Sequence, residues 1–476
     1  MRAYMIQNII DLIETVYFFL WGDWIRIPAP WGGNIELPLL VLLLVPAGIY
    51  FSIRTGFLQI RLLPDMVRIL LGRDREGHAA KNGLSVVQTL VVSTATRVGM
   101  GNLAGVVAAI SLGGAGSLFW IWITAMIGSA TAFIEATLAQ LHKTKDPLYG
   151  GYRGGPAYYM HDHFNKKRAS RGLKEIKSPL AVLFALSGLI CWCGVSQVVS
   201  NSVTSSFYNA FNIPPLYSVI ALVILAAVIV LRKNATVRVL DIMVPVMAGL
   251  YILMTLWIII TNIGQLPSVL SRIFSEAFGL RQAVAGGFGA VMMNGVKRGL
   301  FSNEAGSGSA PCAAAAAESK DPARVGLMQA MGVFIDTVIC TCTAMIMLLA
   351  PADKVAGLVG MDLLQTAMSC YFGETGVVFI AVILWLFSFS TFIGILFYAR
   401  PNIAYLFGDN WISQTAYKLL ALVMLFVGGL AAYTFVWDLG DVGVGLMTIF
   451  NLMALIPLSG EALKCLKEYE AGSKSH

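Results

Sequence analysis

The chain has 476 residues, of which 57% are hydrophobic and 12% are charged, and its formal net charge is +7. Soluble proteins carry about 25% charged residues, so this composition excludes an ordinary soluble protein and predicts a polytopic membrane protein. The basic residues lie in connections between apolar segments rather than on one solvated face. They therefore indicate membrane orientation, and we expect no nucleic-acid partner.

In chain order, residues 5–20 predict an amphipathic helix that lies on the membrane surface or against the bundle. The first span covers residues 37–53, and a basic connection from Arg54 to Lys81 follows, with a second interfacial helix expected over 57–71. Ten further spans follow, two of them broken by polar residues and glycine: 84–111 (broken), 116–140, 179–209, 216–232, 240–262, 283–310 (broken), 324–350, 375–399, 413–435 and 441–464.

Neither a cleavable leader nor a cysteine site is expected. Residues 1–20 contain acidic side chains and lack the basic start and uninterrupted apolar core of a signal peptide. The pairs Cys191/Cys193 and Cys340/Cys342 are spaced i, i+2 within predicted helices, so their side chains point to different faces. We interpret the cysteines as small packing residues.

Lysine and arginine predict the orientation. They cluster in alternate connections: Arg54–Lys81, Lys143–Lys177, Arg232–Arg238, Lys320 with Arg324, Arg400, and Lys464, Lys467 and Lys474 near the end. The opposite connections hold few basic residues: Arg2, Arg26, Arg272, Arg281 and Lys354. By the positive-inside rule we expect a multi-pass protein of the plasma membrane, the inner membrane of a bacterium, with an external N-terminus and a cytoplasmic C-terminus.

The spans divide into two units of similar length, 84–262 and 283–464, between an N-terminal part (1–83) and a cytoplasmic tail (465–476). Each unit has five spans and opens with its broken helix. Because five is odd, the second unit must be inverted relative to the first. This predicts an all-α protein of 11 transmembrane helices: a five-plus-five inverted repeat with one extra N-terminal helix and both breaks face to face near the midplane.

The first break, Ser93–Gly105, interrupts an apolar span. Backbone leaves the helical ladder at bilayer depth only where protein or a water-filled cavity replaces the lost hydrogen bonds, so the break is a candidate binding site. Amides at the start of the outer half-helix suit a carboxylate. The residues in that position are Gly99, Met100, Gly101 and Asn102, whereas Gly105 is interpreted as a packing residue.

Carbonyls released at the end of the inner half-helix, those of Ala95 and Val98, are oxygen ligands of the kind that a hard cation prefers. The sequence Phe387–Thr391 offers hydroxyls within another apolar span, on Ser390 and Thr391. The alternative is that these hydroxyls bond carbonyls one turn earlier in their own helix, and the motif alone leaves both interpretations open.

The second break, Arg298–Ala310, offers Phe301, Ser302, Asn303, Glu304, Gly306 and Ser307 at another half-helix junction. A carboxylate at this depth costs about 2.5 kcal/mol or more and needs a partner. Glu304 therefore either attracts a ligand cation or pairs with Arg97 or Arg298.

Three other polar residues lie within spans. Glu135 and Asp336 are interpreted as members of pairs within the bundle or with basic residues near its cytoplasmic face. Gln197 has a donor and an acceptor, and it is either a ligand contact or a link between helices.

Several runs together resemble the alanine or glycine:cation symporters, also called the sodium:alanine symporter family. They are Gly99–Gly105, Gly113–Trp122, Glu135–Ala139, Arg153–Tyr159 and, as the longest and most specific, Arg298–Pro311. The resemblance implies the fold of the bacterial leucine transporter and uptake of a small neutral amino acid with Na+.

The resemblance also implies site residues. The Gly-x-Gly-Asn segment would hold the substrate carboxylate, Phe301–Ser307 would close the pocket, and Gln197 would lie near the substrate. Thr96 and Gly394 complete the expected substrate-binding set. The positions that match the sodium site are Ala95, Val98, Phe387, Ser390 and Thr391.

Two departures from the family pattern bear on the substrate. The family usually has Gly-Thr-Gly-Asn, whereas this chain has Met100, a larger side chain without a hydroxyl. The family also tends to have Tyr-Tyr-Gly-Glu where this chain has Phe397-Tyr-Ala-Arg400, so a carboxylate is replaced by a cation.

We therefore predict a sodium-coupled symporter that imports alanine or glycine by alternating access, with Na+ as the coupling ion and no other cofactor. Glutamine is the alternative substrate. A passive ion channel also uses broken helices and carbonyl ligands, but this chain has paired breaks and no repeated filter sequence. No enzyme is expected, because the spans contain no His-x-x-His or Gly-x-Ser-x-Gly signature.

Overall fold

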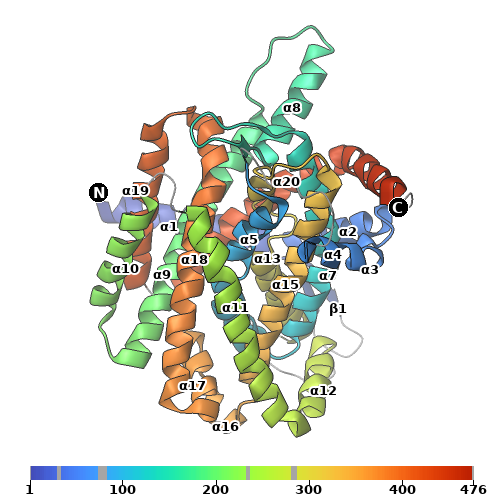
Figure 1. Ribbon diagram of the computed structural model, residues 1–476. Coiled ribbons are helices and arrows are strands. Elements are labelled where there is room, and N and C mark those ends of the chain that lie inside the picture. Colours follow the sequence, from blue (N-terminus) through green and yellow to red (C-terminus); the bar gives the residue numbers. More distant parts are fainter. Residues whose placement is uncertain are drawn as a thin grey trace.

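The structure is a computed structural model that describes residues 2–28, 34–72, 83–231, 236–279, 287–431 and 433–473. Helices make up almost all of it, and the longer ones form a bundle, with α8 projecting from one end (Figure 1). The longer helices are α1 (Arg2–Trp21), α2 (Leu39–Arg54), α7 (Ser117–Leu141), α9 (Pro179–Phe211), α10 (Pro215–Val230), α11 (Thr236–Thr261), α13 (Gly287–Asn303), α15 (Pro322–Leu348), α18 (Glu374–Phe407), α19 (Trp411–Leu430) and α20 (Tyr433–Ser473).

Shorter elements fill the connections. The helices are α3 (Leu58–Arg61), α4 (Leu63–Leu70), α5 (Val86–Arg97), the π-helical turn η1 (Gly101–Gly105), α6 (Val106–Gly113), α8 (Pro156–Ala169), η2 (Ile263–Gln265), α12 (Leu266–Ala277), α14 (Ala310–Ala314), α16 (Ala352–Val355) and α17 (Gly360–Phe372). Two antiparallel hairpins pair β1 (Asp23–Pro28) with β2 (Asn34–Pro38), and β3 (Thr144–Lys145) with β4 (Tyr152–Arg153). These hairpins correct the expectation of an all-α chain. Apart from Leu37 and Pro38 at the start of the first expected span, their residues lie outside the apolar spans, where short strand pairs satisfy backbone groups that no helix engages.

The apolar spans predicted from the sequence correspond to helices, with shifted ends. Among the described residues, seven helices are long and apolar enough to cross a membrane, namely α7, α9, α11, α15, α18, α19 and α20. The span expected over 413–435 ends earlier, at Leu430, and α20 begins at Tyr433. Residues 73–81, 232 and 283–286 of the expected segments lie outside the described residues, as do Arg281 and Lys474. Helices α8, α12, α16 and α17 were not expected in the connections.

Polar residues at the helix ends explain several boundaries. Ser85 begins α5 with a capping box, in which its hydroxyl accepts from the Gln88 amide at 3.1 Å and Gln88 Oε1 accepts from the Ser85 amide at 3.0 Å. Ser178 caps α9, whose first residue is a proline, and Asn212 ends it in the left-handed conformation with φ 56°.

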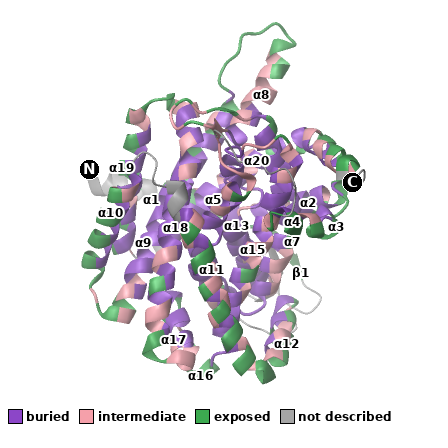
Figure 2. Cartoon of the chain, in the orientation of Figure 1, coloured by how far each residue is buried: buried purple, intermediate pink, exposed green. Residues whose placement is uncertain are grey.

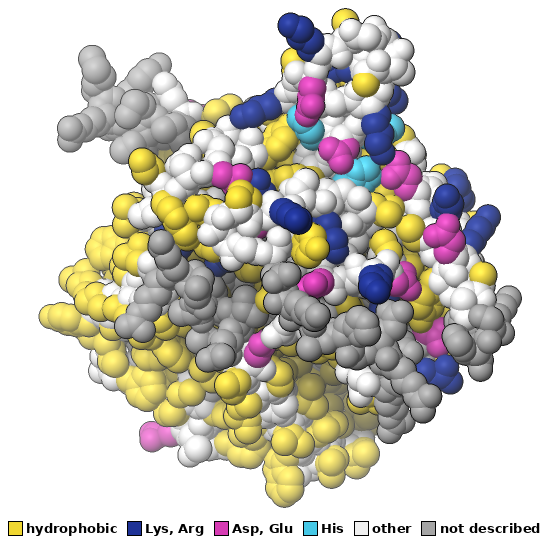
Figure 3. Space-filling model, turned by 45° about the horizontal axis from the view of Figure 1, so that its top comes forward, with side chains coloured by type: hydrophobic (Ala, Val, Ile, Leu, Met, Phe, Trp, Pro, Cys, Tyr) yellow, Lys and Arg dark blue, Asp and Glu magenta, His cyan; other side chains and the backbone are white. Residues whose placement is uncertain are grey.

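The bundle has inner and outer helices (Figure 2). In α9 and in α18, 72% of the most apolar 18-residue stretch is buried within the protein, compared with 28% in α11 and 44% in α19. Small residues allow the inner helices to approach closely: a Cβ on Gly194 of α9 would lie 2.3 Å from the backbone nitrogen of Gly440 on α20. Charged side chains gather at the end of the molecule around α8, while apolar side chains dominate the lower part of the surface in Figure 3.

Candidate functional site

The first predicted break is present. Helix α5 ends at Arg97, Val98 and Gly99 form a turn, and the chain continues through Met100 into η1 and α6, with the two halves bent by 45°. The turn is bonded internally, because the Gly99 amide donates to the Arg97 carbonyl at 2.8 Å and to Asn102 Oδ1 at 2.9 Å. The amides that follow in the first turn of the outer half, those of Gly101, Asn102 and Leu103, lie where a helix has no acceptor of its own.

Oxygen atoms from two helices meet beside this break. The Ala95 carbonyl accepts from Ser390 Oγ at 3.2 Å and from Thr391 Oγ1 at 3.4 Å. Both hydroxyls also donate to the Phe387 carbonyl, at 2.8 and 2.9 Å, so the back-bonding expected as the alternative occurs as well. Val98 is fully buried in the adjoining turn. The structure thus brings the hydroxyls of α18 against the freed end of α5, an oxygen-rich environment suited to a hard cation.

Glycine is required in this turn because α5 and α18 approach each other closely here. A Cβ on Gly99 would lie 1.9 Å from Thr391 Oγ1, so no larger residue fits without separating α5 from α18. The neighbouring Met100 amide donates to the same Thr391 oxygen at 3.3 Å. Gly394, one turn further along α18, serves the same purpose, because its Cβ would lie 2.3 Å from Thr96 Cγ2.

The second break, between α13 and α14, uses left-handed backbone instead. Glu304 has φ 56°, Gly306 has φ 89° and Gly308 has φ 82°. The Gly306 amide donates to Glu135 Oε1 at 3.3 Å, and its carbonyl accepts from Asn451 Nδ2 at 2.9 Å. The turn is therefore held by fully buried side chains from α7 and α20.

Glu304 projects toward the first break. Its Oε2 accepts from Tyr398 OH at 3.1 Å and from Thr96 Oγ1 at 3.5 Å. Of the two partners considered from the sequence, Arg97 Nη1 donates to the Gln329 carbonyl at 3.0 Å, and Arg298 binds another carboxylate. Within the described residues, Glu304 forms no ion pair with either arginine, so its carboxylate faces the space between the breaks.

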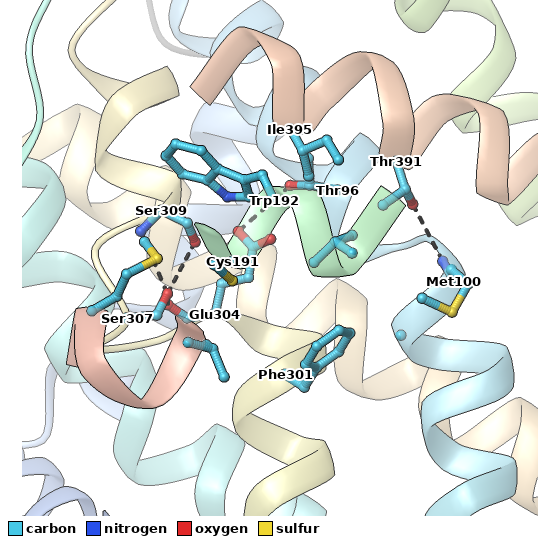
Figure 4. Close-up of a pocket in the computed structure, with 14 residues that line it drawn as sticks. Thr96, Met100, Cys191, Trp192, Phe301, Glu304, Ser307, Ser309, Thr391 and Ile395 are labelled. Atoms are coloured by element: carbon cyan, nitrogen blue, oxygen red, sulfur yellow. Dashed lines mark hydrogen bonds between the residues drawn. The ribbon is translucent and has the colours of Figure 1, made fainter. Parts of the chain in front are cut away.

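A small cavity lies between the two breaks (Figure 4). Its volume is about 30 Å³, which holds a few water molecules at most, so an amino acid enters only if the walls move apart. It is lined by Thr96, Met100, Gly101, Cys191, Trp192, Val195, Phe301, Glu304, Ser307, Ser309, Thr391, Ile395, Val444 and Met447.

Six of the expected substrate-binding residues line this cavity: Thr96, Met100, Gly101, Phe301, Glu304 and Ser307. The other six are not among its lining residues: Gly99, Asn102, Gln197, Ser302, Gly306 and Gly394. Asn102 Nδ2 and Ser302 Oγ both donate to Asp336 Oδ1, at 2.7 and 2.8 Å. Gln197 Nε2 contacts Met424 Sδ of α19 at 3.3 Å, which places Gln197 between helices in this structure.

Two buried acidic residues, Asp336 and Glu135, accept hydrogen bonds from the residues of the two breaks and from Asn451. Asp336 binds Asn102 and Ser302, and Glu135 accepts from the Gly306 amide and from Asn451 Nδ2, the latter at 2.9 Å. Both therefore pair within the bundle, one of the two interpretations drawn from the sequence, and neither forms an ion pair with a basic residue in the part of the chain that the structure describes. Their position within apolar spans is the sequence feature that indicates this role. A carboxylate buried there needs hydrogen-bond donors, and the free amides of unwound backbone can supply them.

An ion pair covers one side of the cavity. Arg298 and Asp441 precede the cavity residues Phe301 and Val444 by one turn on α13 and α20, and they form two hydrogen bonds of 3.1 Å. The guanidinium also lies 4.0 Å from the ring centroid of Trp437, whose ring contacts Phe301. This cluster is buried and lies one turn from two of the residues that line the cavity.

Comparison with known proteins decides the family. Residues 30–476 match the sodium:alanine symporter family. The chain belongs to this family. The probable sodium/glutamine symporter GlnT of Bacillus subtilis strain 168 is 42% identical over 441 residues, covering 92% of this chain and 89% of GlnT. The sodium/alanine symporter AgcS of Methanococcus maripaludis is 34% identical over 469 residues, covering 97% and 98%.

The fold is also found in a solved transporter. MhsT, solved in complex with L-phenylalanine, aligns with a TM-score of 0.56 over 79% of this chain and 89% of its own, at 13% identity. The predicted family, the helical membrane-transporter fold of the leucine-transporter type and the prediction of a sodium symporter rather than an enzyme are confirmed.

The two departures from the family pattern differ in their position. Met100 lines the cavity with its side chain, while its backbone amide keeps the contact to Thr391. Arg400 lies away from the cavity, with its guanidinium 4.1 Å from the ring centroid of Tyr149 and 4.9 Å from that of Phe397. Only the change at Met100 therefore alters the wall of the candidate site.

Proposed function

We propose that this protein imports a small neutral amino acid, alanine or glycine, together with Na+ by alternating access. The observation that supports this most directly is the group of oxygens at the first break, where the hydroxyls of α18 meet the Ala95 carbonyl. Unwound carbonyls at half-helix ends coordinate Na+ in secondary transporters. We assign Na+ to the carbonyls of Ala95, Val98 and Phe387 and the hydroxyls of Ser390 and Thr391.

We assign the substrate to the cavity between the breaks. Its carboxylate would bind the amides of Gly101 and Asn102, at the positive end of a half-helix dipole. Its ammonium would bind the Glu304 carboxylate, which is bonded to Thr96 and Tyr398 and has no basic partner among the described residues. Gly99, Ser302, Gly306, Gly394 and Gln197 complete the proposed substrate-binding set without lining the cavity in this structure.

Na+ and substrate would be coupled because both bind to the same broken helix. The chain from α5 to η1 carries both the carbonyls assigned to Na+ and the amides assigned to the substrate carboxylate. A cation that bridges α5 and α18 fixes the turn between them and so orients the amides. Because linkage is reciprocal, bound substrate raises the affinity for Na+ by the same factor by which bound Na+ raises the affinity for substrate.

The topology that we propose has 11 spans and two inverted five-helix units, 84–262 and 283–464. The bent pair of α5 and η1–α6 adds an eighth candidate to the seven long helices, and α2, α10 and the pair α13–α14 complete the count. The positive-inside rule places the C-terminus in the cytoplasm and the N-terminus outside.

Glutamine is the second candidate substrate, because the relative GlnT is named as a probable sodium/glutamine symporter. Purified protein in liposomes, with an inward Na+ gradient and a panel of labelled amino acids, tests both. We expect saturable uptake of alanine or glycine that disappears without the Na+ gradient. If glutamine competes with labelled alanine better than alanine itself does, the substrate assignment is wrong, while uptake driven equally by H+ would overturn the ion assignment.

The ion site is tested separately. The double substitution Ser390→Ala and Thr391→Ala removes two of the five proposed oxygen ligands, and we expect the Na+ concentration for half-maximal uptake to rise at least about tenfold. Thr341→Ala is the control, since Thr341 is a hydroxyl residue of α15 bonded within its own helix and to Trp122. Unchanged sodium dependence in the double variant would contradict the assignment.

A further inference from the structure

A second and larger cavity lies on the other side of α9 from the candidate substrate site. It has a volume of about 610 Å³ and lies between α9, the end of α18 and α19. Its walls are almost entirely apolar, with Leu186, Ile190 and Leu420 each more than 40% exposed at its mouth. It is therefore a groove that opens on the outside of the bundle.

The walls of the groove are formed mainly by one face each of α9 and α19, with Ile403 and Phe407 of α18 and Leu439 of α20 closing it. On α19 the lining residues are Ile412, Ser413, Ala416, Tyr417, Leu420 and Met424, and those from Ser413 on have the i, i+3, i+4 spacing of one helix face. From Ser413 to Met424 this face extends about 16 Å, at about 1.5 Å per residue. The groove is thus an elongated apolar slot at membrane depth, with a shape that suits a hydrocarbon chain.

One end of the slot is polar and positively charged. Asn410 and Ser413 line it there, and Asn410 Oδ1 accepts from the Ser413 amide at 2.8 Å. Lys177 is exposed beside it, with its ammonium 2.8 Å from the carbonyl of Leu406, the neighbour of the lining residue Phe407. The nearby carboxylate of Asp409 is paired with Arg153, so it does not cancel this charge.

We propose that the groove binds one phospholipid of the surrounding bilayer, with an acyl chain along α9 and α19 and its phosphate at Lys177. The charge at one end and the apolar walls match the two parts of that molecule. A helix from a second copy of the chain fits less well, because membrane helices associate through small residues and the mouth carries leucine and isoleucine.

The bound lipid would support the wall of the transport site. Leu189, Ile190 and Cys193 of α9 face the groove, while Cys191 and Trp192 face the small cavity. Tyr417 OH donates to the Leu189 carbonyl at 2.8 Å, so the groove also lies against the contact between α9 and α19. An acyl chain in the slot therefore packs directly behind α9, one of the helices that line the small cavity.

The test is retention of phospholipid by the purified full-length protein, measured by native mass spectrometry after detergent washing. Ala416→Trp fills the slot, and Thr415→Trp is the matched control, an exposed neighbour on α19 outside the lining. We expect wild type and the control to retain one phospholipid and Ala416→Trp to retain at least tenfold less. Equal retention in all three would overturn the proposal. So would loss of a dimer in Ala416→Trp, which would assign the groove to a second copy.

A measurement on the unmodified protein covers the case in which Ala416→Trp does not fold. Wild-type protein in liposomes containing a phospholipid with a photoreactive group near the end of its acyl chain is irradiated, and the adducts are mapped by peptide sequencing. We expect adducts concentrated on Leu186–Cys193 and Ala416–Met424. Adducts spread evenly over other exposed helices, such as α10, would overturn the proposal. A Lys177→Gln variant should reduce phospholipid retention about threefold, and unchanged retention would remove the headgroup assignment.

Discussion

The two helix breaks solve the same problem in different ways. At the first, the residues of the described turn have negative φ, and the unwound backbone is satisfied by hydroxyls and an amide oxygen in close contact, with Gly99 against Thr391. At the second, three residues have positive φ, and the turn is held by the buried side chains of Glu135 and Asn451.

This difference indicates a division of roles. In the first break glycine provides proximity, so that α5 and α18 can share a cation. In the second break glycine provides a left-handed turn that directs the Glu304 carboxylate into the cavity. The first break is therefore sensitive to side-chain volume. The second is sensitive to backbone strain and to loss of the Glu135 carboxylate that binds the Gly306 amide.

The largest effect is expected from Gly99→Ala. The added methyl would lie 1.9 Å from Thr391 Oγ1, so α5 and α18 must separate at the proposed ion site. Overpacking costs about 1–3 kcal/mol, and we expect Na+-driven uptake in proteoliposomes to fall up to about 100-fold. Gly105→Ala is the control, because its Cβ would meet only Trp437 Cη2, at 3.9 Å. Equal loss in both variants would contradict the importance of proximity at Gly99.

Glu135→Gln should have the next largest effect. A glutamine cannot accept from both Gly306 and Asn451, and Asn451 cannot reverse its amide, because its Oδ1 accepts from Tyr159 and its Nδ2 donates to Gly306. An unsatisfied buried group costs about 1–3 kcal/mol, so we expect uptake about tenfold lower. The exposed Glu374→Gln should transport like wild type. Normal uptake by Glu135→Gln would show that the second break does not need this carboxylate.

Gly306→Ala should be milder than either. The nearest atoms to its Cβ would be Leu44 Cδ2 at 3.4 Å and Thr131 Cγ2 at 3.5 Å, which is ordinary contact. The cost is then the strain of a left-handed alanine, about 1–2 kcal/mol, and we expect uptake to fall about fivefold. Measuring uptake by this variant and by Gly99→Ala in the same assay shows which break is more sensitive to replacement of its glycine. If it proves the more damaging of the two, the distinction between proximity and handedness is wrong.

The smallest effect is expected from Met100→Thr, which changes the cavity wall and leaves the backbone contact to Thr391 in place. A smaller side chain widens the site, so competition by larger amino acids such as glutamine should improve, by less than the effect expected for Gly306→Ala. The sodium requirement should stay unchanged. A large shift in sodium dependence would mean that the side chain, as well as the amide, takes part in the first break.

The sequence allowed both breaks to be predicted, because glycine and polar residues that interrupt an apolar span can be recognised from the order of residues along the chain. It also allowed the hydroxyls of Ser390 and Thr391 to be placed opposite the freed carbonyl of Ala95, with help from the family resemblance. The position of Gln197 was not determined in this way, since a polar residue on a buried helix has several neighbours. In the structure it contacts Met424 of α19.

What the sequence determined by itself was that this chain crosses a membrane, where its helices break, and that buried charges such as Glu135, Asp336 and Arg298 must have partners. Only the tertiary structure decided which partners these are. Glu135 meets Asn451 316 residues further along the chain, and Arg298 meets Asp441 at a separation of 143 residues. The physical reason is that burial fixes the energetic need for a hydrogen bond, which is local, whereas the packing of distant helices fixes the atom that supplies it.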